Sequence, residues 1–168
     1  MPDLTPCPIC RESSNAEKTA RSSYYVDCPR CDRFEIERKL TVDGFIPDHL
    51  RPYLSAATRQ ATENGQRFTI VETPLREIAE LDERTTVSEK LNKLLVFLAK
   101  RTRAPGSAHV FRHSLDYPLV DARDEKEFVA YLRYLRDQRM LVALATCGPG
   151  EAAYQLTIDG WRKLEPVT

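Results

Sequence analysis

The sequence predicts a mixed α+β fold, and three observations indicate it. Two Cys-x-x-Cys motifs lie within the first 31 residues, next to short aromatic and β-branched stretches that favour strands. Two later stretches, Leu91–Leu98 and Phe128–Leu135, have apolar residues at helical spacing. Near the C-terminus, the apolar run Met140–Ala145 and the stretch Ala153–Thr157 flank Gly148-Pro149-Gly150, which predicts a β-hairpin.

The length and charge of the chain limit what it can be. Its 168 residues (19.3 kDa) suffice for one ordinary domain, or for a small domain with a metal-stabilised satellite. Lys plus Arg number 25 and Asp plus Glu number 25, so the formal net charge is zero. This balance excludes a histone-like, wholly electrostatic binder of nucleic acids but allows a local basic patch.

The apolar segments predict no membrane association. The longest apolar runs, Leu94–Ala99 and Met140–Ala145, are far shorter than the roughly 20 residues that span a membrane. No apolar segment typical of a signal peptide follows Met1. We therefore expect a cytoplasmic protein without a membrane partner.

Four of the five cysteines form the motifs Cys7-Pro-Ile-Cys10 and Cys28-Pro-Arg-Cys31, with seventeen residues between them. This spacing matches a paired-knuckle zinc site, because two residues between thiols let both sulfurs face one ion. We predict that Cys7, Cys10, Cys28 and Cys31 hold one structural Zn²⁺, with no coordination position left for a catalytic water. Disulfides are disfavoured without an export signal, and neither motif has the strand-to-helix context of a redox pair.

Residues 1–40 are predicted to form a zinc ribbon. Strands at Ser23–Val26 and Phe34–Ile36 would flank the second cysteine motif, and the metal would supply the fold of a segment too small to bury its own core. Basic and aromatic residues near that motif, such as Arg30 and Tyr25, could stack on a nucleic-acid strand. The acidic residues between them cancel the charge, which favours a stabilising role instead.

Residues 41–84 are predicted to form a helical connector. A helix from His49 to Ala61 would end at Asn64-Gly65. A short strand is expected at Arg67–Val71, and Thr73-Pro74 is typical of the start of a second helix.

Residues 85–168 are predicted to form one compact unit. Thr86 and Glu89 fit a capping box at the start of a helix that Pro105-Gly106 would stop. A strand at Ala108–Phe111 and a short helix at Leu115–Val120 would follow. The apolar faces of the two main helices are then expected to consist of Leu91, Leu94, Leu95 and Leu98, and of Phe128, Tyr131, Leu132 and Leu135.

This order of helix, strand, short helix, helix, β-hairpin and terminal helix resembles a winged helix-turn-helix. The ending Leu156-Thr-x-x-Gly160-x-x-x-Leu164 is similar to the wing strand and last helix of many bacterial winged-helix regulators. Together with the ribbon, it also resembles the non-enzymatic front portion of some bacterial multidomain proteins associated with conflict or defence. The resemblance implies a winged helix-turn-helix domain over residues 85–168 and a DNA-binding regulatory role.

Two groups of basic residues would serve such a role. Lys126, Arg133 and Arg136 fall within about 80° of one another around the second main helix, with Arg123 toward the edge of that face. Residues 88–115 contain six Lys or Arg against Glu89 alone, a local charge of +5. The candidate nucleic-acid-binding residues are Lys100, Arg101, Arg103, Arg112, Arg123, Lys126, Arg133 and Arg136.

Other features leave a second hypothesis open. A solvated helix face, with Asp137 paired to Arg133, would account for part of the basic pattern. Acidic residues at Asp124, Glu125 and Glu127 would repel phosphates, and the turn from Cys147 to Glu151 contains no Lys or Arg. The alternative is therefore a protein-interaction adaptor or sensor subunit that docks a partner protein rather than DNA.

No catalytic constellation is visible in the sequence. His109 and His113 lie in a predicted strand, where their positions would be about 13 Å apart. Phosphate-binding loops, metalloprotease motifs and nucleophile elbows are absent. We therefore expect a non-enzymatic protein without a small-molecule substrate. Cys147 is expected to be a free thiol near a turn.

Overall fold

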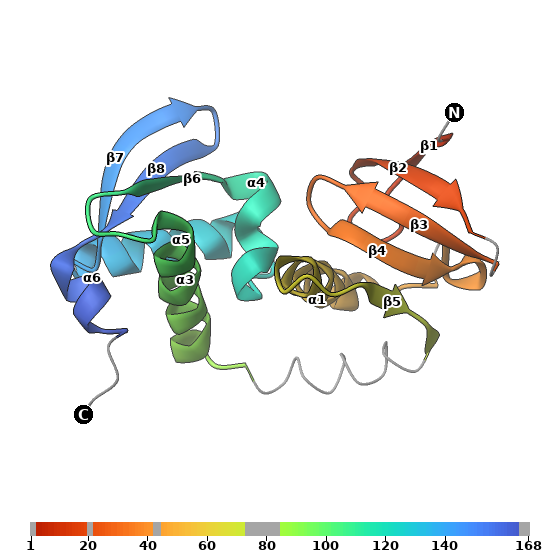
Figure 1. Ribbon diagram of the computed structural model, residues 1–168, viewed down its shortest axis with the longest axis horizontal. Coiled ribbons are helices and arrows are strands. Elements are labelled where there is room, and N and C mark those ends of the chain that lie inside the picture. Colours follow the sequence, from red (N-terminus) through yellow and green to blue (C-terminus); the bar gives the residue numbers. More distant parts are fainter. Residues whose placement is uncertain (1–2, 20–21, 42–44, 73–84, 165–168) are drawn as a thin grey trace. The chain divides into compact units, whose positions relative to one another are not determined.

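A computed structural model describes residues 3–19, 22–41, 45–72 and 85–164. The chain is mixed α+β, as the sequence predicts, with two sheets and five α-helices in the described residues. It divides into two compact units, Met1–Thr85 (the first unit) and Thr86–Thr168 (the second unit) (Figure 1).

The first unit is built on a five-stranded sheet with the order β1-β2-β3-β4-β5. Strands β1 to β4 are antiparallel, and β5 pairs in parallel with β4, with Phe68 opposite Phe34. The elements are β1 (Asp3–Pro6), β2 (Ser13–Lys18), β3 (Ser23–Cys28), β4 (Asp32–Glu37), the 3₁₀ helices η1 (Arg38–Thr41) and η2 (Asp48–Leu50), α1 (Arg51–Glu63) and β5 (Phe68–Ile70).

The described part of residues 41–84 does not stand apart from the ribbon as a connector. Helix α1 and strand β5 confirm the helix and strand expected there, but both belong to the first unit. Leu50, Leu54 and Ile70 are buried in one core with Phe34 and Ile36 of the ribbon. The reason is physical, because the ribbon alone offers too little apolar surface for a core. The helix expected at residues 73–74 lies outside the described residues.

The second unit has the element order that the sequence predicts. It contains α3 (Val87–Thr102), β6 (Ala108–Arg112), α4 (His113–Asp116), η3 (Tyr117–Val120), α5 (Glu125–Asp137), β7 (Leu141–Gly148), β8 (Glu151–Leu156) and α6 (Ile158–Arg162). The capping box is confirmed, since Glu89 N donates to Thr86 Oγ1 and Thr86 N donates to Glu89 Oε2. The three strands form an antiparallel sheet with the order β6-β8-β7.

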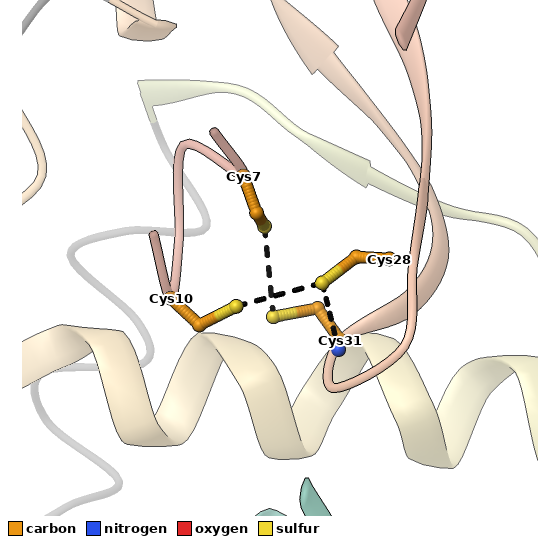
Figure 2. Close-up of side chains that lie close together, drawn as sticks. All are labelled: Cys7, Cys10, Cys28 and Cys31. Carbon is orange, nitrogen blue, oxygen red and sulfur yellow. Dashed lines mark hydrogen bonds between the residues drawn. The ribbon is translucent and has the colours of Figure 1, made fainter. Parts of the chain in front are cut away.

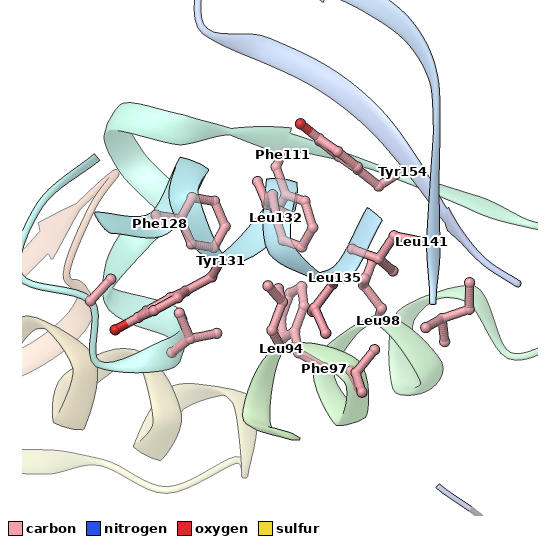
Figure 3. Packing of buried hydrophobic residues seen from close by; sticks show 14 residues of the cluster. Leu94, Phe97, Leu98, Phe111, Phe128, Tyr131, Leu132, Leu135, Leu141 and Tyr154 are labelled. Atoms are coloured by element: carbon pink, nitrogen blue, oxygen red, sulfur yellow. The ribbon is translucent and has the colours of Figure 1, made fainter. Parts of the chain in front are cut away.

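Helices α3 and α5 meet the sheet in an aromatic and aliphatic core (Figure 3). The ring of Phe111 on β6 packs edge-on against Phe128 on α5, with centroids 5.3 Å apart. Leu94 and Leu98 of α3 and Leu132 of α5 are fully buried beside them. The predicted apolar faces therefore become the core, except that Leu91 is only partly buried.

The Leu-Thr-x-x-Gly ending has a structural explanation. Thr157 caps α6, because its Oγ1 accepts a hydrogen bond from Gly160 N at 3.1 Å. A side chain at position 160 would collide with the backbone oxygen of Met140 and come within 3.1 Å of Leu156 Cδ2. Only glycine lets α6 approach the start of β7 this closely.

Candidate metal centre and candidate nucleic-acid interface

The four predicted metal ligands converge on one point in the first unit (Figure 2). Their Sγ atoms all lie within 4.8 Å of one another. Cys7 Sγ is 3.8 Å from Cys31 Sγ, and Cys10 Sγ is 3.5 Å from Cys28 Sγ. Ligands at about 2.3 Å from a tetrahedral metal ion stand about 3.8 Å apart. The spacing of the sulfurs therefore matches what one four-coordinate ion requires.

Both cysteine motifs adopt the same kind of turn. The residues that follow them, Arg11 and Asp32, have φ angles of 63° and 60°, which reverse the chain in the left-handed region. In the first turn, Cys7 N donates to Glu12 O at 2.7 Å. In the second turn, Cys28 lies opposite Asp32 in the β3–β4 pairing. Each turn thus directs both of its sulfurs toward the same centre.

One face of α1 supports both turns. Arg51 Nη1 donates to the carbonyl oxygens of Pro8 and Ile9 at 2.9 and 2.7 Å. Ser55 Oγ is hydrogen-bonded to Cys31 Sγ at 3.2 Å, and Arg59 Nη1 donates to the Arg30 carbonyl at 3.4 Å. Arg51, Ser55 and Arg59 are spaced by four and so share one helix face, which we name the α1 stripe.

The α1 stripe was not predicted from the sequence. The four-residue spacing was a visible signal, but the sequence does not show what that helix face contacts. Arg30, considered above for nucleic-acid stacking, instead forms an ion pair with Glu12 and lies mostly buried. Its role in the described structure is to hold the two knuckles together.

The cluster favours a cation on electrostatic grounds. Burial raises the pKa of the Cys31 thiol, whereas the hydrogen bond with Cys10 lowers the pKa of Cys28. A hydrogen bond with Cys10 also raises the pKa of Cys7. The four thiols therefore cannot all ionise together as they stand, because each thiolate opposes the next. A bound cation would remove this conflict by stabilising all four thiolates. Among the described residues, these cysteines form the one cluster with metal-site geometry.

The eight predicted nucleic-acid-binding residues are all exposed on the second unit. Lys100 and Arg101 lie in the last turn of α3, and Arg103 is its left-handed C-cap. Arg112 ends β6, Arg123 precedes α5, and α5 carries Lys126, Arg133 and Arg136. Burial raises the pKa of the Tyr154 hydroxyl, and the nearby positive charges of Arg136 and Arg133 oppose this by lowering the pKa. These two arginines therefore lie near one side of the sheet.

Some of these cations already have partners. Arg101 lies over the ring of Phe97, 5.4 Å from its centroid. Asp137 forms an ion pair with Arg136 at 3.1 Å. The sequence had indicated Arg133 as its partner on a solvated helix face. An exposed pair of this kind contributes little energy, so Arg136 stays accessible to a stronger anion.

Two lysines in the basic stretch 88–115 have internal roles. Lys90 is only 6% exposed, and its Nζ lies 3.1 Å from Glu127 Oε1. Lys93 forms an ion pair with Asp121. These pairs tie α3 to α5 and to the residue that follows η3. The local charge of +5 therefore overstates what the surface offers, and the four candidates Lys100, Arg101, Arg103 and Arg112 carry what remains.

The acidic start of α5 is largely structural. Asp124 caps the helix by accepting a hydrogen bond from Glu127 N at 2.8 Å. Glu127 accepts hydrogen bonds from Tyr131 Oη and from Arg123 N, in addition to its ion pair with Lys90. The negative charge of Glu127 is thus already compensated. Glu125 is also exposed, and within the described residues it neither caps the helix nor forms an ion pair.

The remaining candidate groups have ordinary surroundings. His109 packs against Phe97 and Phe111, and His113 lies between Phe128 and Tyr154. The strand expected at Ala108–Phe111 is confirmed as Ala108–Arg112, but His113 begins α4, so the expectation that His109 and His113 lie in one strand is wrong. Cys147 is an exposed free thiol beside the β7–β8 turn. No helix in the described residues is long and apolar enough to cross a membrane.

Comparison with protein-family models, with curated proteins and with solved structures found no match to this chain. The resemblance seen in the sequence therefore rests on its motifs and element order alone.

The α1 stripe yields a prediction about metal affinity. Replacing Arg51 with alanine keeps all four sulfurs but removes both hydrogen bonds to the first knuckle. We expect metal affinity to fall about 10- to 100-fold, as for other groups that orient ligands. Competition with a chromophoric chelator measures this. The matched control is Arg33→Ala, an exposed arginine on β4 whose loss should leave the affinity unchanged.

Glu127 yields a prediction about pH. Burial alone would raise its pKa, but hydrogen bonds from Tyr131 and Arg123 and the ammonium of Lys90 outweigh burial, so the pKa lies below its ordinary value. The stabilisation is therefore complete above the unfolded pKa of about 4.3 and is lost as the pH falls through the lower folded value. Glu127→Gln should destabilise the second unit by about 1–3 kcal/mol at pH 7 and flatten this acid dependence.

The fluorescence of Trp161, the one tryptophan of the chain, reports unfolding of the second unit in urea. Glu125→Gln, at the neighbouring exposed acid, is the control; it removes a favourable charge from the first turn of α5 and should lower stability by at most about 0.3–1 kcal/mol, with a weaker pH dependence. Equal effects of the two substitutions would contradict the role of the Lys90–Glu127 pair.

Proposed function

We propose that this chain is a non-catalytic, zinc-binding regulatory protein that binds DNA through a winged helix in its second unit. The observation that carries the proposal is the distribution of charge on that unit. Lys90 and Lys93 are paired with acids inside the unit, while the eight candidate basic side chains are exposed on α3 and its C-cap, on β6, on α5 and at Arg123 before the N-cap of α5.

Zinc is the ion we propose for the cysteine cluster. Four thiolates around a tetrahedral centre are the donor set of structural zinc sites, and they leave no open position for substrate or water. The metal would thus stabilise the ribbon and the α1 stripe, and would not take part in catalysis.

The zinc assignment is tested by metal content and by local unfolding. Zinc-loaded wild-type protein should contain one ion per chain, and Cys28→Ser or a strong chelator should remove it. We expect the first unit to unfold, seen as loss of circular dichroism, while Trp161 fluorescence stays native because the second unit has its own core. Cys147→Ser, which changes the cysteine outside the cluster, should retain the ion. A metal-free protein with an intact first unit would refute the assignment.

The winged-helix interpretation is supported by the order of elements from α3 to α6 and by the antiparallel β7–β8 hairpin. In a helix-turn-helix, the second helix enters the major groove and its N-terminal part reaches base edges. Helix α5 would take that part, with Arg123, Lys126, Arg133 and Arg136 toward the groove. Lys100, Arg101, Arg103 and Arg112 would contact phosphates, and the resemblance favours transcriptional or defence-associated control.

DNA binding is tested with random duplexes across a salt series. If at least four phosphates are contacted, log K should fall with log salt at a slope of about −4 or steeper. Reversing charge with Lys126→Glu and Arg133→Glu should weaken binding and flatten the slope. Lys18→Glu, at an exposed position of β2, is the matched control and should bind as the wild type does. Unchanged binding after the α5 reversals would refute docking through α5.

A second candidate function is a protein-interaction adaptor or sensor subunit. The observation that favours it is the β7–β8 hairpin, whose turn from Cys147 to Glu151 carries no cation for a phosphate. This function predicts no DNA affinity even at low salt and a stoichiometric complex with a partner protein.

A further inference from the structure

Tyr154 on β8 is a buried side chain whose hydroxyl has no hydrogen-bond partner in the described residues. Only 8% of Tyr154 is exposed, and its ring packs against Phe111 and His113, with centroids 6.0 and 6.3 Å away. Figure 3 shows the hydroxyl oxygen at the margin of the core cluster. Because buried tyrosines usually satisfy their hydroxyl, this rigidly held donor calls for a ligand.

The face of the hairpin that carries Tyr154 is open on the side of β7. Residues directly opposite in antiparallel strands share a face, and Ala143 lies opposite Tyr154. Leu141, two residues before Ala143, points to the same face and is buried in the core with Leu135 of α5. Ala143 itself is exposed. The cover that the core provides therefore ends between Leu141 and Ala143, beside Tyr154.

Two arginines of α5 bring positive charge to this boundary. Arg133 and Arg136 each follow a leucine of α5 that is buried in the same core as Tyr154, and both arginines are exposed. The charges of both reach the Tyr154 hydroxyl, where they lower its pKa against the effect of burial. Arg133 forms no ion pair in the described residues, and Arg136 pairs with its exposed neighbour Asp137. Two guanidinium groups and a hydroxyl are thus available to one anion.

We infer that Tyr154 Oη, Arg133 and Arg136 form a phosphate-binding site between α5 and the β7–β8 hairpin. A phosphate group accepts hydrogen bonds from a hydroxyl and from guanidinium groups, and the planar guanidinium fork matches its oxygens. The source of the phosphate is the backbone of a nucleic acid, because the same unit exposes further cations at Lys100, Arg101, Arg103 and Arg112. Naming this source rests on the proposed DNA binding, whereas the site itself does not.

The site explains how a hairpin without cations in its turn can still contact a phosphate. A Cβ at Gly150 in the turn would lie 3.8 Å from Glu125 Oε1, so the turn has an acid beside it. That acid disfavours an anion at the turn. At Tyr154 the positive charge comes from α5 instead. On bound DNA, the start of α5 would reach base edges, and its second half would hold the backbone on the hairpin side.

Tyr154→Phe tests the hydroxyl, because it removes one oxygen and no charge. Binding of the full, zinc-loaded chain to a random duplex should weaken about tenfold, the loss expected for one hydrogen bond to a charged acceptor. The dependence of log K on log salt should keep its slope, since the hydroxyl displaces no counterion. Arg133→Gln and Arg136→Gln should each flatten that slope by about 0.9. A duplex that binds Tyr154→Phe as tightly as the wild type overturns the inference and leaves DNA binding standing.

The matched control is Tyr131→Phe. Tyr131 is as buried as Tyr154 and lies in the same core, but its hydroxyl donates to Glu127. In urea unfolding followed by Trp161 fluorescence, Tyr131→Phe should lower the stability of the second unit, and Tyr154→Phe should not. Duplex binding by folded Tyr131→Phe should equal that of the wild type. If Tyr154→Phe destabilises the unit as much as Tyr131→Phe does, its hydroxyl has an internal partner and the inference is overturned.

A negative charge on either face of β7 tests where the phosphate lies. Ala143→Asp places a carboxylate on the face of Tyr154, whereas Val142→Asp places the same charge on the opposite face, beside Gln155. Ala143→Asp should weaken duplex binding at least about tenfold more than Val142→Asp does, because like charges brought together are strongly unfavourable. Equal effects of the two variants would overturn a site on the Tyr154 face.

Inorganic phosphate separates the site from its source. In a titration with sodium phosphate, matched in ionic strength with sodium chloride, the NMR signals of the Arg133 and Arg136 side chains should shift in the wild type and shift less in Tyr154→Phe. If phosphate binds in this way and no duplex does, the site stands, and the nucleic-acid source fails together with the proposed DNA binding. If neither phosphate nor a duplex depends on Tyr154, the inference is overturned.

Discussion

The convergence of four cysteine sulfurs is the constraint on which the first unit depends. Strand β2 contributes little apolar surface, because of its six residues only Ser14 is buried. A sheet of such strands cannot hold itself together by burial alone. The two knuckles fix the ends of β1–β2 and β3–β4, and the α1 stripe holds both knuckles against a helix whose Leu54 is itself buried in the core.

In the second unit, the number of charged residues in the sequence differs from the number of charges that the surface offers to a partner. From the sequence alone, Lys90 would be counted as a residue that attracts phosphate and Glu127 as one that repels it. In the structure the two form an ion pair between α3 and α5 and neutralise each other. The same holds for Lys93 and Asp121. Internal pairing removes equal numbers of both signs, so the exposed surface keeps its positive balance with fewer acids near the start of α5.

The sequence was most informative where the determinants are local. The capping box at Thr86, the apolar spacing of Phe128 and Leu132, and the turn at Gly150 each depend on residues within a few positions of one another, and each is confirmed. The knuckles belong to this group because each Cys-x-x-Cys motif fixes its own turn. The convergence of the four sulfurs was predictable from their spacing, since few other chemistries use that arrangement.

What could not be predicted depends on long-range pairing. Strand β2 has no alternating apolar pattern, so nothing in Ser13–Lys18 distinguishes it from a loop until β3 lies beside it. The parallel addition of β5 to β4, and the contact of Ser55 with Cys31, join residues more than twenty positions apart. Their partners are defined only by the folded arrangement. For the same reason, residues 41–84 were expected to connect two domains, whereas their described part completes the first unit.

The position of the α1 stripe in the chain has a consequence for synthesis. The four candidate metal ligands lie between positions 7 and 31, whereas the side chains that support their turns lie at positions 51 to 59. On a ribosome the thiols emerge first, and a metal ion can meet them before α1 exists. Binding of an ion by the four thiols and support of their turns by α1 would therefore be separate events in time.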